Sequence, residues 1–75
     1  MPKLPTLNGR EISRALEKAG FRSVRQRGSH AIMTHADGRV AVVPMHGGRD
    51  VLPETLQGIL KQAWLSPDEF LRLLR

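Results

Sequence analysis

The chain has 75 residues, 40% of them apolar, and a formal net charge of +5 at pH 7. This length predicts one domain, residues 1–75, whose core is too small to enclose a deep substrate cavity. The sequence contains no cysteine, which excludes disulfides, thiolate catalysis and zinc–cysteine sites. Its apolar runs are too short to span a membrane, and its first residues lack the apolar stretch of a signal peptide. We therefore expect a soluble, cytoplasmic protein that does not engage membranes.

The positive charge is concentrated in the first part of the sequence. Residues 1–30 contain seven Lys or Arg and two Glu, a net charge of +5, whereas residues 31–75 contain five basic and five acidic residues. Phosphate neutralisation supplies most of the sequence-independent affinity for nucleic acid. The asymmetry therefore favours a nucleic-acid-binding face on the first helix and strand, although small proteins can also be basic merely for solubility.

The first predicted elements are a tail and a helix. Residues 1–7 contain two prolines and are predicted to be a flexible tail. Asn8 and Glu11 have the spacing of a capping box, which predicts the start of a helix. Apolar residues then recur at helical spacing, and Gly20 is expected to end the helix in the left-handed conformation.

Three antiparallel strands are predicted next, over residues 21–27, 29–35 and 40–43. Asp37 and Gly38 predict a two-residue hairpin turn, which would place Ile32 opposite Val43. Both faces of this sheet are then partly apolar, and a few short helices can cover only one. The second face is either a partner surface or an unusually apolar solvent face.

Two further helices complete the chain. Pro53 is favoured in a first helical turn and predicts the start of the second helix. Ser66 and Glu69 form another capping box, which opens a short helix that ends near Leu74. The order helix–three antiparallel strands–helix plus a short C-terminal helix predicts an α+β two-layer sandwich with the helices on one face of the sheet.

The segment RQRGSH, residues 25–30, is the candidate site. His30 can exchange protons near neutral pH, and Arg25 and Arg27 could stabilise the charge that develops on a phosphate. Gly28 would let a polyanion approach the backbone. The three histidines of the chain lack the spacing of a zinc site, so no metal and no cofactor are expected. The residues alone also allow His30 to be an ordinary polar residue at a sheet edge.

Several motifs together resemble the HicA family of toxins. They are GF at 20–21, RQRGSH at 25–30, THADGR at 34–39, VPMH at 43–46, LQGILKQA at 56–63 and LSPDEF at 65–70. Each piece is weak alone, but their order and spacing are specific in combination. The resemblance covers nearly all of the chain after residue 8.

This resemblance implies a double-stranded-RNA-binding-domain-like fold and a metal-independent endoribonuclease that cleaves mRNA. It also implies neutralisation by a cognate HicB-type antitoxin. The family's catalytic histidine falls on His30, Gly28 and Ser29 match the turn that presents it, and His46 matches a recurring position. The residues expected to contact RNA are Lys18, Arg22, Arg25, Arg27 and His46.

One residue of the chain departs from the family pattern. The family commonly has glycine at the position of Trp64, which puts the left-handed cap of the second helix in doubt. We expect Trp64 to pack against the protein rather than to stack on RNA bases.

The alternatives to the predicted nuclease function are a non-catalytic RNA-binding module of the same fold and a pure protein-interaction domain. The first is disfavoured because the second helix offers RNA only one lysine, Lys61.

Overall fold

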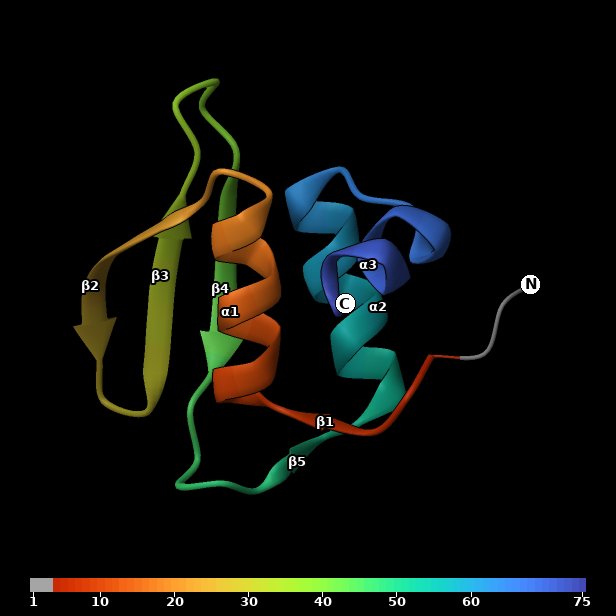
Figure 1. Cartoon of the computed structure of the whole chain (residues 1–75). Coiled ribbons are helices and arrows are strands. Elements are labelled where there is room, and N and C mark those ends of the chain that lie inside the picture. Colours follow the sequence, from red (N-terminus) through yellow and green to blue (C-terminus); the bar gives the residue numbers. More distant parts are fainter. Residues whose placement is uncertain (1–3) are drawn as a thin grey trace.

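A helix, a three-stranded antiparallel sheet and two further helices follow one another in the computed structural model, which describes residues 4–75 (Figure 1). The elements are β1 (Leu7–Asn8), α1 (Gly9–Lys18), β2 (Arg22–Arg27), β3 (His30–Thr34), β4 (Val40–Pro44), β5 (Asp50–Val51), α2 (Pro53–Ala63) and α3 (Pro67–Leu73). The predicted α+β fold class and element order are confirmed, and the arrangement agrees with a double-stranded-RNA-binding-domain-like fold.

The short strands β1 and β5 were not predicted. They pair antiparallel, with Leu7 opposite Val51, and both of these side chains are buried. Leu4 also packs against the core. The prediction of a flexible tail is therefore wrong at Leu7, and residues 1–3 of that segment lie outside the described residues.

Both ends of α1 follow from the sequence. The Asn8 side chain accepts a hydrogen bond from the Glu11 backbone (2.9 Å), and the Glu11 carboxylate accepts one from the Asn8 backbone (3.0 Å). At the other end Gly20 is left-handed (φ +100°), and the backbone of Phe21 donates to the carbonyl of Leu16 (3.0 Å). This pattern satisfies the last helical carbonyls and turns Phe21 into the core.

The β3–β4 hairpin differs from the prediction by one residue. Ile32 lies opposite Val42, not Val43, because the loop contains three residues between His35 and Arg39 rather than two. Gly38 takes the left-handed position that ends such a three-residue loop (φ +99°). Since side chains alternate between faces, this shift exchanges the faces that the prediction had assigned to β4.

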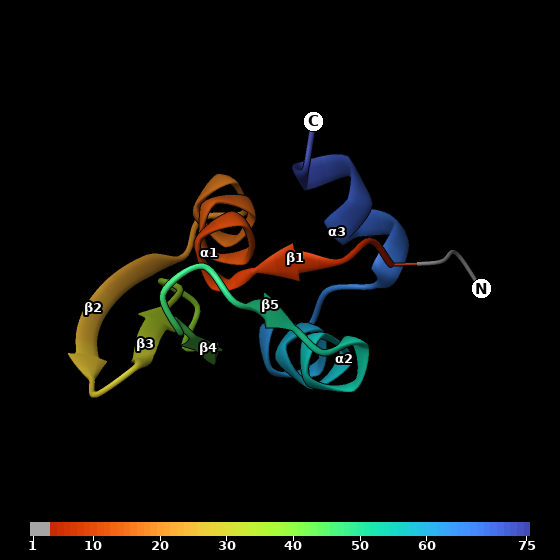
Figure 2. The same ribbon diagram turned by 90° about the horizontal axis from the view of Figure 1, so that it is seen from below.

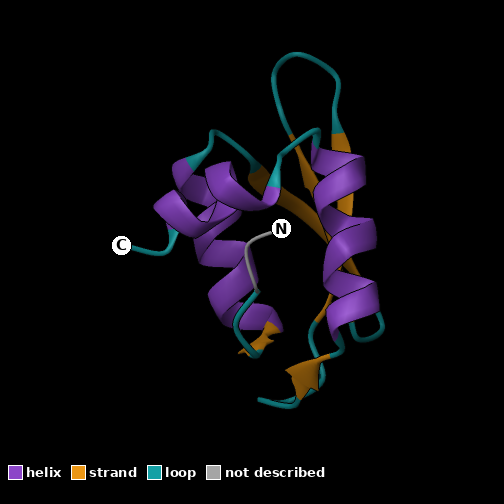
Figure 3. Ribbon diagram, turned by 90° about the vertical axis from the view of Figure 1, so that its right-hand side faces the viewer, coloured by secondary structure: helices purple, strands orange, loops and turns teal. Residues whose placement is uncertain are grey.

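The helices do not all lie on the sheet in the same way. Figure 2 shows α1 above the sheet, α2 beside the β4 edge and α3 above α2, and Figure 3 shows the helices in front of the three-stranded sheet. The edge contact is direct, because the Val42 backbone N–H donates to the Gln62 side chain (3.0 Å). The buried sheet residues face α1; they are Ala31, Met33, Ala41 and Val43.

The opposite side of the sheet carries no helix within residues 4–75. We call it the outer face; it comprises Arg22, Arg25, Arg27, His30, Ile32, Thr34, Val40, Val42 and Pro44. Its arginines, His30 and Val40 are exposed, and the remaining side chains are half-buried. None of the helices in this part of the chain has the length and apolar character that crossing a membrane requires.

The structure at the end of α2 bears on two predictions about Trp64, its backbone conformation and the packing of its side chain. The left-handed cap forms without glycine: Trp64 has φ +57°, and Leu65 donates to the carbonyl of Leu60 (2.9 Å). The expectation that Trp64 packs against the protein is met only by the Arg39 guanidinium, 5.7 Å from its ring centroid, and the side chain is not part of the core, since it is 70% exposed. The predicted Ser66–Glu69 capping box of α3 is confirmed, with hydrogen bonds of 2.9 and 3.1 Å.

Candidate active site

A β-bulge in β2 keeps its three arginines on one face of the sheet. The β2–β3 register shifts between Ser23 and Arg25, so that Val24 has no partner residue on β3. With the bulge, Arg22, Arg25 and Arg27 lie opposite Thr34, Ile32 and His30. Residues directly opposite each other in an antiparallel pair share a face. The turn after Arg27 already fixes Arg27 and Arg25 on the face of His30, and without the extra residue Arg22 would point toward the helix side of the sheet. The turn and the bulge together therefore place all three arginines on the face that carries His30.

His30 is the first residue after a tight turn. Arg27 pairs with His30 across a two-residue loop in which Gly28 has φ +58° and Ser29 does not have a positive φ. This is the pattern of a type II′ turn, whose first central position favours glycine. A Cβ atom on Gly28 would meet nothing within 4 Å, so space beside the turn is open to a ligand. The turn thus places an exposed imidazole beside an exposed guanidinium.

His46 reaches the same end of the sheet from β4. The backbone of Met45 donates to the carbonyl of Ser29, which extends the β3–β4 pairing beyond Pro44. Gly47 and Gly48 then form a turn with positive φ at both positions, closed by the bond from the Arg49 N–H to the His46 carbonyl (2.8 Å). The rings of His46 and His30 meet edge to face, with centroids 5.8 Å apart and an interplanar angle of 80°.

An open groove of about 390 Å³ runs past both histidines. Its other lining residues include Pro44, Arg49, Asp50 and Thr55. Sequence reasoning missed Arg49 and Thr55, since neither belongs to a recognisable motif. Arg49 could have been found from the segment HGGR, residues 46–49, in which a glycine pair separates it from a histidine. The groove is small and lies between strand ends, which suits one segment of an extended polymer better than an enclosed metabolite.

Lys18 does not share this site. It lies at the end of α1, on the helix side of the sheet, and its ammonium donates to the backbone carbonyl of Arg75 (2.6 Å). Arg14, one turn earlier, lies on the same helix and lines a different groove between α1 and α3. The positive charge of residues 1–30 is therefore divided between two layers of the protein, and β2 supplies the part that lies next to His30.

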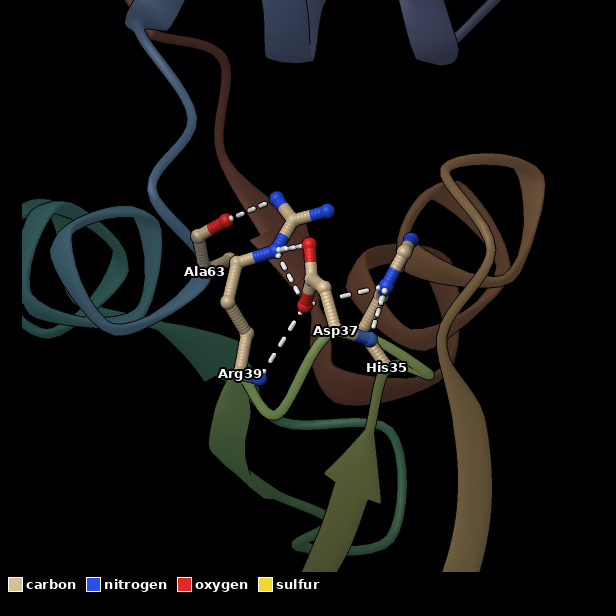
Figure 4. A network of polar contacts seen from close by, with 4 residues as sticks. All are labelled: His35, Asp37, Arg39 and Ala63. Carbon is tan, nitrogen blue, oxygen red and sulfur yellow. Dashed lines mark hydrogen bonds and ion pairs between the residues drawn. The ribbon is translucent and has the colours of Figure 1, made fainter.

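A second histidine site, at the other end of β3, is structural. The His35 Nδ1 atom lies 3.0 Å from Asp37 Oδ1 and accepts a hydrogen bond from the Asp37 backbone (Figure 4). Arg39 donates to both oxygens of Asp37 and to the carbonyl of Ala63 (2.6 Å) at the end of α2. The hydrogen bond from the Arg39 side chain holds the pKa of Asp37 below its ordinary value. These bonds connect the hairpin loop to α2.

His35 and Arg39 of the same cluster also contact the buried ring of Phe21. The His35 ring packs edge-on against Phe21, with centroids 5.2 Å apart, and the Arg39 guanidinium lies 5.0 Å from the Phe21 ring centroid. A Cβ atom on Gly20 would come within 2.8 Å of His35 Nε2, so α1 ends directly against this ring. His35 is therefore held between protein groups, whereas His30 faces an open groove.

Comparison with protein families identifies the chain. Residues 9–65 match the family model described as HicA toxin of bacterial toxin-antitoxin. No curated protein matches the sequence. The family match covers more than half of the chain, includes both histidines of the groove and ends at the capped C-terminus of α2. The chain belongs to the HicA toxin family, in which a toxin acts with a cognate antitoxin.

Proposed function

We propose that this HicA-family toxin is a metal-independent endoribonuclease that cleaves mRNA at the groove beside His30. The observation that carries the proposal is the pairing of His30, which lines an open groove, with Arg27 on the outer face. An imidazole can exchange protons at neutral pH, and a guanidinium can bind the phosphate that is attacked. RNA carries its own nucleophile, the 2′-hydroxyl next to each phosphate, so the protein needs to supply no nucleophile.

The roles of the individual residues follow from their positions. His30 would act as general base or general acid toward the 2′-hydroxyl or the leaving oxygen. Arg27, directly opposite, would stabilise the negative charge of the phosphorane. Arg25 and Arg22 continue the row along the outer face and would bind neighbouring phosphates. Gly28 and Ser29 would present His30, and no cofactor takes part.

The outer face also has the character of a protein-binding surface. It combines arginines with exposed Val40 and half-buried Ile32 and Val42, a mixture of charge and apolar surface that is common at protein interfaces. We propose that the cognate HicB-type antitoxin neutralises the toxin by covering this face and its arginines, which would exclude RNA. A purified toxin–antitoxin complex that cleaves RNA as fast as the free toxin would contradict occlusion.

The test of the nuclease activity compares wild-type protein with His30→Ala on an mRNA substrate in the presence of a chelator. We expect wild-type protein to cleave and the variant to be slower by about 10²-fold or more, the usual contribution of a general acid or base. Equal cleavage by the two proteins would rule out the role of His30, and cleavage that the chelator abolishes would rule out the metal-independent mechanism. RNA binding without cleavage by the wild-type protein would favour the alternative, a non-catalytic RNA-binding module.

A charge-matched pair of variants tests the RNA path. Arg27→Ala should weaken RNA binding and reduce the slope of log affinity against log salt by about 0.7, the value for one phosphate contact with a single strand. Arg14→Ala removes the same charge from α1, on the other side of the sheet, and should leave the slope nearly unchanged. The measurement is RNA binding at several salt concentrations, made in the His30→Ala background to prevent cleavage. Equal slopes in the two variants would contradict the proposed path.

A further inference from the structure

Cleavage of RNA by its own 2′-hydroxyl requires two proton transfers. The O2′–P bond forms as the proton leaves the 2′-hydroxyl, and the P–O5′ bond breaks as a proton reaches the departing 5′-oxygen. The products are a 2′,3′-cyclic phosphate and a free 5′-hydroxyl, and no oxidant, reductant or further reactant is consumed. One base and one acid must therefore lie near the same phosphate, each about 2.6–3.2 Å from the oxygen it serves. His30 can supply only one of these two functions at a time.

The groove contains a second group of the required kind next to His30. The His46 ring lies edge to face with the His30 ring at a centroid distance of 5.8 Å, and both side chains are exposed to the groove. The two rings are held by independent turns, Gly28–Ser29 for His30 and Gly47–Gly48 for His46. Imidazole is the side-chain group best suited to proton transfer in proteins that work near neutral pH. A phosphate bound at their edges would meet both rings at once.

Other side chains of the groove fit the second function less well. The carboxylate of Asp50 has no hydrogen bond or ion pair with His30 within residues 4–75, and its negative charge would repel the phosphate. Arg49 cannot exchange a proton at working pH, because a guanidinium stays charged. It can instead bind the phosphate, since it lines the same groove as the two histidines. Among the described residues, His46 is the group in contact with His30 that can transfer a proton.

We propose that His46 is the proton-transfer partner of His30. One of the two imidazoles takes the proton of the 2′-hydroxyl, and the other protonates the 5′-oxygen as it leaves. This inference rests on the proposed ribonuclease function and assigns the second catalytic residue of that same site. Arg27 and Arg49 would hold the phosphate at the edges of the two rings.

The test uses an RNA oligonucleotide that wild-type protein cleaves, prepared with either oxygen or sulfur at the bridging 5′ position of the scissile bond. A thiolate leaves without being protonated, so the sulfur substrate does not need the acid. We expect His30→Ala and His46→Ala both to cleave the oxygen substrate more slowly by about 10²-fold or more. We expect the sulfur substrate to restore one of the two variants, the one that lacks the acid, and to leave the other slow. His46→Gln should behave as His46→Ala, since it keeps a polar side chain but cannot transfer a proton.

The outcomes separate this inference from the proposed function. If wild-type protein cleaves, His30→Ala is inactive and His46→Ala is as fast as wild type, the role of His46 is wrong and the nuclease function stands. Slow cleavage of both substrates by both variants would also overturn the shared proton transfer and leave His46 a binding residue. If wild-type protein cleaves no RNA, the proposed function itself fails. Circular dichroism and urea unfolding of each variant check that loss of activity is not loss of fold.

Discussion

The two ends of β3 each carry a histidine, and they differ in what surrounds it. His35 lies beside a carboxylate, packs on Phe21 and is enclosed by a network that reaches α2. His30 contacts a second histidine, pairs with an arginine and opens onto a groove. A histidine–aspartate pair is often taken as a sign of catalysis, yet here it closes a hairpin loop. The pair that lacks a carboxylate is the one that lines an open groove.

The difference is one of access and satisfied bonds. The Asp37 carboxylate accepts from Arg39 and lies next to His35, so its bonds are used within the loop. No hydrogen bond to another protein group engages the side chains of His30 or His46 within residues 4–75. Groups whose bonding capacity is unused in the free protein remain available to a ligand. Substituting the histidine at each end in turn should therefore separate effects on activity from effects on stability.

The largest expected effect is a contrast between two histidine variants: one should lose activity and the other should lose stability. His30→Ala should lower the cleavage rate by about 10²-fold or more and leave the free energy of unfolding within about 0.5 kcal/mol of wild type, since the side chain is exposed. His35→Ala should lower the free energy of unfolding by about 1–2 kcal/mol, because it removes the Phe21 contact and the bond to the Asp37 backbone. Its cleavage rate per folded molecule should stay within about twofold. Rate measurements and urea unfolding of both variants decide the comparison, and loss of catalysis in folded His35→Ala would contradict it.

The next effect concerns the link between the hairpin loop and α2. Arg39→Met keeps an extended apolar side chain but removes the bonds to Asp37 and to the Ala63 carbonyl. Hydrogen bonds of charged groups contribute about 1.5–3 kcal/mol, so we expect a loss of that size in the free energy of unfolding. Arg72→Met, at an exposed arginine of α3, is the control and should change little. Similar values for the two variants would show that the network adds no stability.

A smaller effect should appear only as a dependence on pH. Because the Arg39 side chain lowers the pKa of folded Asp37, this carboxyl contributes stability above its ordinary pKa of about 3.9, and the contribution is lost as pH falls through the lower, folded value. Asp37→Asn lacks this contribution. The stability difference between wild type and variant should thus be present at neutral pH and shrink in acid, as measured by urea unfolding at several pH values. Glu17→Gln provides a surface control, and a difference that grows in acid would have the wrong sign.

The smallest effect is expected at Trp64. Its left-handed backbone costs about 1–2 kcal/mol for a residue other than glycine. The contact of the exposed ring with Arg39 returns about 0.5–1 kcal/mol, and glycine also makes the unfolded chain more flexible. Trp64→Gly should therefore change the free energy of unfolding by less than about 1 kcal/mol, whereas removal of a buried tryptophan costs about 3–5 kcal/mol. A loss in the second range would mean that this ring stabilises the protein as a core residue does.

Local signals in the sequence predicted most of the fold. The capping boxes at Asn8 and Ser66 and the glycine at position 20 each satisfy backbone groups within a few residues, so their effect can be read locally. The Asp37–Gly38 turn was recognised but its length was not. A two-residue and a three-residue loop fit the same dipeptide, and the bonds made by Arg39 to distant groups accompany the longer one. The β1–β5 pair was missed because two-residue strands leave no periodic pattern.

The candidate site, like the fold, could be predicted from the sequence only in part. RQRGSH and the charge asymmetry pointed to His30 and its arginines, but Arg22 shares the face of Arg25 and Arg27 only because of the bulge at Val24, which no residue type announces. Lys18 was grouped with them because charge counted along the chain ignores which layer a helix occupies. The contact of His30 with His46 joins residues 16 positions apart, and only the register of β3 with β4 reveals it.

The bulged strand also bears on how copies of the protein meet one another. In the described sheet β2 is paired on one side only, so its other edge exposes backbone donors and acceptors. Regular edges of this kind recruit strands from neighbouring molecules, and bulges and charged side chains prevent such recruitment. The irregularity at Val24 interrupts the repeat, and the three arginines repel an identical strand. We therefore expect the arrangement that places the β2 arginines on the outer face also to keep the free toxin from self-associating through its sheet.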